Sequence, residues 1–446
     1  MGGKPVGRNR TAMLALACVV GALAANLIFN LAAARAGLHH PYSSFLFLPQ
    51  DRFADFFKLS FSYPGAPMHP VSSSWGLDPL LNSFRDFVEH NDLKFLNHFH
   101  VPPLPTMLAL SWRATMTVVD PVLLYYLWAV GGLVTLGLIA YSVTDQKVAA
   151  IALAALAVVN YPIAFMLDRG HIFSLVCGIV LSAALLRKEK PAPADWLSIL
   201  LFAIAFNFRP NAAIFPVGLW LCNRGWSTLD LVKFGTAAVA VFAAAFLIDH
   251  AVYPAYTPQS WMQGMNDYAV AYLGYNFGLA YGSSLYGALK ATFGYSAVTY
   301  WLPPIITAVT VILLAVSCRR TRMPQSHVAF VLASLYCIGA QVFADYHLMV
   351  FVVPLALLVR EGGIRRAADW AAFTGSCFVL SPKNYLFHQY EPNATPWSWQ
   401  ILMNPVVLLV ASAVVVGLAL TRSERRSDEP RAEAPAGDLE TSLVAN

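Results

Sequence analysis

Charged residues are scarce in this chain of 446 residues, where Asp, Glu, Lys and Arg together make up 12%, against roughly 25% in an ordinary soluble domain. Hydrophobic residues make up 58%, and such an excess over so long a chain requires repeated membrane spans rather than one anchor on a soluble head. The formal charge is +5, but its cations are scattered between apolar blocks. No basic stripe could follow a phosphate backbone, so no nucleic-acid partner is expected.

The cysteines and acidic residues also lack the spacing of a disulfide framework or a metal site. The six cysteines show neither disulfide nor zinc spacing and fall in or beside apolar segments, so we interpret them as packing residues. They are Cys18, Cys177, Cys222, Cys318, Cys337 and Cys377. No acidic cluster has metal-ligand spacing, which predicts chemistry without a metal or a cofactor.

Apolar blocks dominate what is there, and they predict an all-α polytopic integral membrane protein with about twelve transmembrane helices. The first block, 12–34, follows a basic N-terminus and is too long for a signal-peptide core, so we interpret it as an uncleaved first span. The later blocks cover about 121–143, 148–167, 172–186, 196–206, 212–222, 231–248, 301–317, 327–343, 348–359, 367–380 and 401–420.

Placing the connections in order puts the basic ones on the cytoplasmic side, as the positive-inside rule demands. This holds only if 196–222 is a hairpin of two short helices broken between Asn207 and Pro210, because one long helix would invert every later loop. We therefore expect Arg209 at a break in the outer half of the membrane. A proline kink with a snorkelling arginine is the competing interpretation.

The chain is expected to form one multi-pass domain, 1–422, in the inner (plasma) membrane, with a disordered cytoplasmic tail at 423–446. Two polar segments, about 39–120 and 253–300, are too long for turns and fall on the outer side, where the site is expected. The first contains apolar stretches at 53–61 and 104–110 that indicate interfacial helices. The second is rich in Tyr and Trp, which suit both lipid headgroups and sugar faces.

Short motifs follow one another in a particular order. They are Asp51-Arg-Phe-Ala-Asp55, Tyr63-Pro-Gly, Pro102-Pro103-Leu104, Leu167-Asp-Arg-Gly170-His171, Asn207-Phe-Arg209-Pro210, Ser284-Leu-Tyr286-Gly287 and Asp345-Tyr-His347. In this order they resemble glycosyltransferase family 87, the GT-C transferases of the polyprenyl-phosphate-sugar-dependent mannosyltransferase type. His171 and Arg209 depart from the pattern, since glutamine and lysine are usual there.

The resemblance implies inverting transfer of a hexose, most simply mannose, from a polyprenyl-phosphate sugar to a glycolipid or glycan acceptor on the extracytoplasmic face. The topology favours the same donor class, because no nucleotide-sugar pool exists outside the membrane. The alternative is a multispan transporter or flippase of lipid-linked sugars. Transporters typically pair broken helices and place ionisable residues in mid-membrane, whereas this sequence has one clear break.

The chemistry of such a transfer specifies the candidate residues. A carboxylate must take the acceptor proton, and Asp55 is our candidate base, with Asp51 one helical turn earlier as the alternative. The leaving phosphate needs cationic or imidazole donors, for which Arg209, His347 and Lys58 are the candidates. The motifs add His171, Asp168, Ser284 and Tyr286 as candidates for substrate contact.

Overall fold

The computed structural model describes residues 101–115, 118–119, 121–187, 195–274, 282–381 and 399–428, with scattered positions between 13 and 28. Within these ranges the chain forms helices and no β-strand, which confirms the all-α prediction. The predictions for Asp51, Asp55 and Lys58 and for a helix at 53–61 concern residues outside the described part.

Among the described residues, four helices are long and apolar enough to cross a membrane: α6 (Pro121–Tyr141), α12 (Thr228–Val252), α15 (Ala297–Arg320) and α19 (Trp399–Asp428). A fifth span results if α7 (Lys147–Val159) and α8 (Tyr161–Arg169), bent by 44° at Asn160, count as one. The described chain is thus a helical protein with four or five helices able to span a membrane.

Shorter elements fill the remaining apolar blocks. They are α9 (Ile172–Leu186), α10 (Trp196–Phe208), η3 (Pro210–Ala213), α11 (Ile214–Leu221), α16 (Gln325–Ile338), η6 (Asp345–Phe351), α17 (Val352–Arg360) and α18 (Ala367–Leu380). The stretch 104–110 lies in α5 (Pro103–Thr115), and the second polar segment contains α13 (Pro258–Ala269) and α14 (Leu285–Phe293). Helix α19 continues to Asp428, into the segment expected as a tail.

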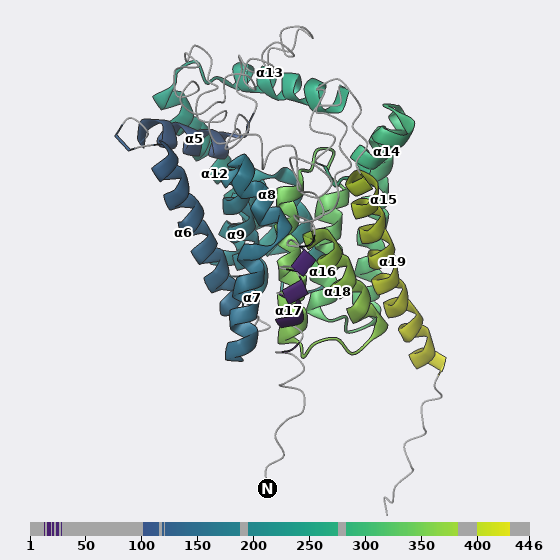
Figure 1. The fold of residues 1–446 in the computed structure, drawn as a ribbon. Helices are drawn as coiled ribbons and strands as arrows, with labels where there is room; N and C mark the ends of the chain where they lie inside the picture. Colours follow the sequence, from purple (N-terminus) through teal and green to yellow (C-terminus); the bar gives the residue numbers. More distant parts are fainter. Residues whose placement is uncertain are drawn as a thin grey trace, which may run out of the picture.

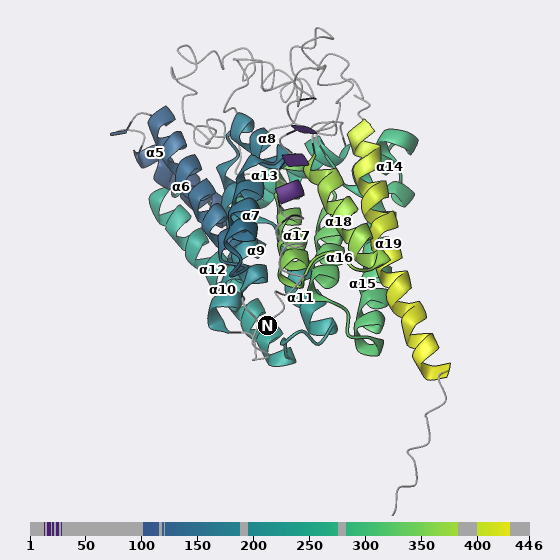
Figure 2. The ribbon, with the colours of Figure 1, turned by 60° about the horizontal axis from the view of Figure 1, so that its bottom comes forward.

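The upright helices form two groups with η6 and α17 between them (Figures 1 and 2). Helices α6, α7, α9, α10 and α12 pack on one another in the first group, and α15, α16, α18 and α19 in the second. Element η6 contacts α8 and α9 on one side and α16 and α18 on the other. Helix α13 lies across one end of the bundle, with α5 and α14 at the same end (Figure 1).

Basic connections gather at the other end of the bundle, which we call the basic end. Arg360 donates to the carbonyl oxygen of Leu186 over 3.3 Å and to Oε1 of Gln325 over 2.6 Å, so the ends of α9, α16 and α17 lie together. Arg187 forms an ion pair with Asp195 at 2.6 Å, so the start of α10 lies at this end as well. The connection after α11 also lies here, because Arg224 donates to the carbonyl oxygen of Met323 in the connection between α15 and α16.

Helices α10 and α11 therefore leave from and return to the basic end, as the hairpin interpretation predicts.

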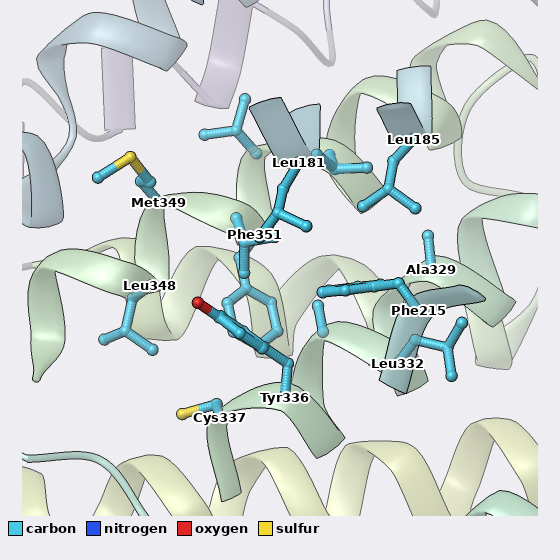
Figure 3. Packing of buried hydrophobic residues seen from close by; sticks show 14 of the residues in the cluster. Leu181, Leu185, Phe215, Ala329, Leu332, Tyr336, Cys337, Leu348, Met349 and Phe351 are labelled. Carbon is cyan, nitrogen blue, oxygen red and sulfur yellow. The ribbon is translucent and has the colours of Figure 1, made fainter. Parts of the chain in front are cut away.

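Close packing joins the two helix groups around α16 and η6 (Figure 3). A Cβ atom on Gly178 of α9 would lie 2.3 Å from Sδ of Met349, and one on Gly218 of α11 would lie 2.2 Å from Cδ2 of Leu332. Because lipid is as apolar as the core, association of membrane helices depends on such close contact at small residues. The two glycines allow α9 and α11 to approach the elements that present the polar groups described next.

Candidate functional site

Arg209 stands alone between two helical segments in an extended conformation, with φ −147° and ψ 105°. Pro210 lacks an amide donor and cannot continue α10, so it opens η3 instead. Two asparagines hold the break in place. Asn207 donates to the carbonyl oxygens of Ala203 at 2.8 Å and Ala238 of α12 at 3.0 Å, and Asn211 donates to that of Tyr336 of α16 at 2.7 Å.

The guanidinium of Arg209 is half-buried among aromatic rings. Its electrostatic neighbours are Tyr346 of η6, Tyr268 of α13, Tyr336 of α16 and Cys177 of α9. Across the described part of the chain, Arg209 forms no ion pair and no side-chain hydrogen bond. A charged side chain half-buried among aromatic rings is expensive unless something pairs with it, so the surroundings suit an anion.

The turn between α8 and α9 positions the first imidazole. Gly170 has φ 71°, a left-handed conformation that favours glycine, and its amide closes α8 onto the carbonyl oxygen of Leu167. His171 follows at once as the N-cap of α9, where Nδ1 accepts the amide of Ser174 over 3.2 Å. The Gly170-His171 pair in the sequence is thus a helix stop followed directly by a helix start.

Ser174 joins this imidazole to a second one. Its Oγ lies 2.7 Å from Nδ1 of His171 and 3.3 Å from Nε2 of His347. Since Nδ1 of His171 accepts the Ser174 amide, it carries no proton, and Oγ must donate to it. Oγ is then the acceptor for a proton on Nε2 of His347. The chain of bonds assigns one tautomer to each neutral imidazole.

Arg209 and His171 both lie close enough to His347 to act on it electrostatically. Three candidates from distant motifs, His171, Arg209 and His347, therefore meet where the two helix groups join. His171 also stacks on Tyr346, with ring centroids 4.3 Å apart. One permanent cation, two imidazoles and tyrosine hydroxyls can neutralise and hydrogen-bond an oxyanion.

A network of buried hydrogen bonds around Asp345 supports η6, and the sequence did not predict it. Asp345 is fully buried and accepts hydrogen bonds from Tyr161 at 3.2 Å and from Ser283. Asn404 of α19 donates to Oγ of Ser283 over 2.7 Å. The Asp345 side chain thus turns to Tyr161 and Ser283, while His347 turns to Ser174. The break before Tyr161 carried a signal, since an asparagine shortly before a proline, Asn160 and Pro162, stands there as Asn207 and Pro210 stand at the other break.

The remaining predicted residues lie elsewhere. Ser284 is the buried N-cap of α14 and donates to the carbonyl oxygen of Gln341 over 3.3 Å. Tyr286, also buried, donates to the carbonyl oxygen of Leu273 over 2.9 Å. Asp168 lies in the last turn of α8, but its side chain is outside the described part, as are Asp51, Asp55 and Lys58. Ser284 and Tyr286 thus each have a structural partner.

The described ranges contain no group of three or more His, Cys, Asp or Glu residues that could hold a metal ion. Comparison with known proteins gave no match to a family model, to a curated protein or to a solved structure.

Proposed function

We propose that this chain transfers a hexose, with mannose as the first candidate, from a polyprenyl-phosphate donor to a glycolipid or glycan acceptor. The transfer inverts the anomeric carbon and takes place on the extracytoplasmic side of the plasma membrane. The observation that carries the proposal is Arg209, a half-buried guanidinium without a described ion-pair or hydrogen-bond partner, close to His347, which Ser174 links to His171. A lipid-linked phosphate is an anion presented by a membrane, and Arg209 lies between two short apolar segments that lipid could surround.

In the proposed reaction Arg209 binds the donor phosphate through charge-assisted hydrogen bonds. Nε2 of His171 carries the proton in the tautomer given above and can donate to a phosphate oxygen as negative charge develops there. His347 is linked through Ser174 and adds a second donor when protonated. Arg209, His171 and His347, which we call the polar cluster, lie at the junction of the two helix groups. Asp345 holds η6 in place there.

The general base belongs to the first outer loop in this proposal. Asp55 takes the acceptor proton, with Asp51 as the alternative, and Lys58 assists at the phosphate. We propose a GT-C arrangement of about twelve membrane crossings. This number requires the short helices of the α10–α11 hairpin and of the α16–α17 pair to lie in the membrane as well. That count places the basic end in the cytoplasm and the α13 end outside.

The test is a transfer assay on purified, reconstituted protein, using polyprenyl-phosphate mannose labelled in the sugar. Binding of polyprenyl phosphate alone is measured in parallel. Arg209→Gln should weaken that binding about 10- to 100-fold, because a charge-assisted bond to a buried partner is worth roughly 1.5–3 kcal/mol. Arg320→Gln is the matched control, since Arg320 is an exposed guanidinium at the end of α15. Unchanged binding and transfer in folded Arg209→Gln would reject the proposal.

The same assay separates the two acids. Asp55→Asn should lower transfer about 100- to 10,000-fold with donor binding retained, because an amide cannot take a proton. Asp51→Asn should change transfer only mildly. The reverse result would assign the base to Asp51, and full activity in both variants would remove the first loop from the chemistry.

Two observations favour the alternative of a transporter or flippase. Helix breaks occur at both Asn160 and Arg209, and transporters commonly contain paired broken helices. Asp249 of α12 is fully buried, and neither of its carboxylate oxygens has a hydrogen-bond partner among the described residues. If the reconstituted protein moves intact polyprenyl-phosphate sugar between leaflets and transfers none of it, this alternative replaces the transferase.

A further inference from the structure

Three sulfur atoms from separate segments converge at the basic end, far along the bundle from the polar cluster. Cys222 caps the C-terminus of α11, Cys318 lies in the last turn of α15, and Met323 lies in the connection to α16. Sγ of Cys318 lies 3.7 Å from Sδ of Met323, and the thiols of Cys318 and Cys222 are close enough to act on each other electrostatically. We call these three residues the sulfur cluster.

Two arginines surround the sulfur cluster. Arg224 donates to the carbonyl oxygen of Met323 and acts electrostatically on Cys318, and both Arg224 and Arg319 act electrostatically on Cys222. Cys222 and Met323 are buried, while Cys318 is half-buried, so the cluster is reached through Cys318. All the cysteines involved are free thiols.

We propose that Cys222, Cys318 and Met323 form a binding site for one soft monovalent metal ion, of which Cu(I) is the biological example. Thiolate and thioether sulfur are the ligands that select Cu(I). Three sulfurs at roughly 2.3 Å from a central ion lie about 4 Å from one another, close to the 3.7 Å between Cys318 and Met323.

Charge and ligand number also favour a monovalent ion. Binding replaces the two thiol protons, which leave to solvent, by one cation, so the complex of two thiolates, one thioether and Cu(I) carries one negative charge. Arg224 and Arg319 offset that charge. Structural Zn²⁺ almost always takes four ligands, and no His, Asp, Glu or further Cys joins this pair in the described ranges.

The experiment is a titration of the reduced, purified full-length protein with Cu(I) under nitrogen, in competition with the chelator bathocuproine disulfonate. Wild type should retain one Cu(I) per chain. Cys318→Ser and Cys222→Ser should lose it, and Met323→Leu, which keeps the side-chain volume, should bind about tenfold more weakly. X-ray absorption of the wild-type complex should show sulfur ligands only.

Cys377→Ser is the matched control, because Cys377 is also close enough to a second thiol, that of Cys18, to be acted on by it electrostatically. It should retain Cu(I) as wild type does. Retention of Cu(I) in Cys318→Ser, equal loss in Cys377→Ser, or no retention by wild type would overturn the proposal. A Cys222–Cys318 disulfide in wild type that forms in place of a copper complex would do the same. Thermal unfolding of each variant checks that lost binding does not reflect lost folding.

Discussion

Lys290 is a buried amine at the α13 end of the molecule, and it shares one acceptor with a tyrosine. Its Nζ donates to the carbonyl oxygen of Leu273 over 2.8 Å, and the hydroxyl of Tyr286 donates to the same oxygen over 2.9 Å. Burial lowers the pKa of Lys290 to about 8 and raises the pKa of Tyr286 to about 12. Both residues lie in α14, outside the helices that can span a membrane.

The lowered pKa of Lys290 predicts a stability that increases with pH. An unfolded lysine titrates near 10.4, so between about pH 8 and 10 the unfolded chain holds a proton that the folded amine has lost. The contribution of Lys290 to the free energy of unfolding therefore rises across this window, by at most about 1.4 kcal/mol per pH unit, and is constant below it. Above about pH 10 the raised pKa of Tyr286 acts in the opposite direction.

The measurement compares melting temperatures of wild type and Lys290→Met in detergent from pH 7.5 to 10. The difference should move in favour of wild type as pH increases. Parallel curves for the two proteins would contradict the prediction, whatever their offset.

Breaks between consecutive helices position the polar side chains of the candidate site. Asn160 stabilises both sides of the α7–α8 break: its Oδ1 accepts the amide of Ile163 over 3.1 Å, and its Nδ2 donates to the carbonyl oxygens of Leu156 at 2.9 Å and Ala157 at 3.2 Å. The bend of 44° then directs Tyr161 to Asp345. One asparagine thus replaces the backbone hydrogen bonds that the break removes.

Asn160→Leu should destabilise the protein by about 2 kcal/mol or more, because it leaves buried backbone groups at the break without partners. Sugar transfer should fall further than stability alone explains, since Tyr161 would no longer be held against Asp345. Asn160→Asp keeps the cap acceptor and loses the donors, so its stability should lie between those of wild type and Asn160→Leu. Thermal unfolding and the transfer assay measure both effects. A leucine variant as stable as wild type would show that the cap contributes nothing.

The whole molecule has two chemically different ends, and this predicts its orientation. The connections at the basic end are held together by Arg187, Arg224 and Arg360, while α13 covers the opposite end. From the positive-inside rule we expect the basic end in the cytoplasm.

Reporter tags inserted after Lys190 and after Arg366 should therefore be cytoplasmic, and tags near Ser73 and Asn393 should be extracytoplasmic. Accessibility to a membrane-impermeant reagent in intact cells measures this. An external signal for the tag after Lys190 would overturn the orientation, and the proposed outer position of the site with it.

The sequence by itself determined which segments of the chain form helices. Apolar runs long enough to satisfy their own backbone hydrogen bonds become helices in lipid, and each predicted block from 121 to 420 contains a helix, although the block 327–343 extends past α16, which ends at Ile338. Pro210 also revealed the break at Arg209, because proline removes a donor wherever it stands. The block at 148–167 was predicted as unbroken, and the bend at Asn160 shows that prediction to be wrong.

Only the tertiary structure decided which polar side chains meet. Tyr161 and Asp345 are 184 positions apart, and Ser174 and His347 are 173 apart, so no local pattern could pair them. Their pairing depends on how helices dock, which in turn depends on contacts such as Gly178 against Met349, where an added Cβ would lie 2.3 Å from Sδ and the Met349 side chain would have to move. Helix formation follows from each segment alone, whereas docking depends on the shapes of two segments at once.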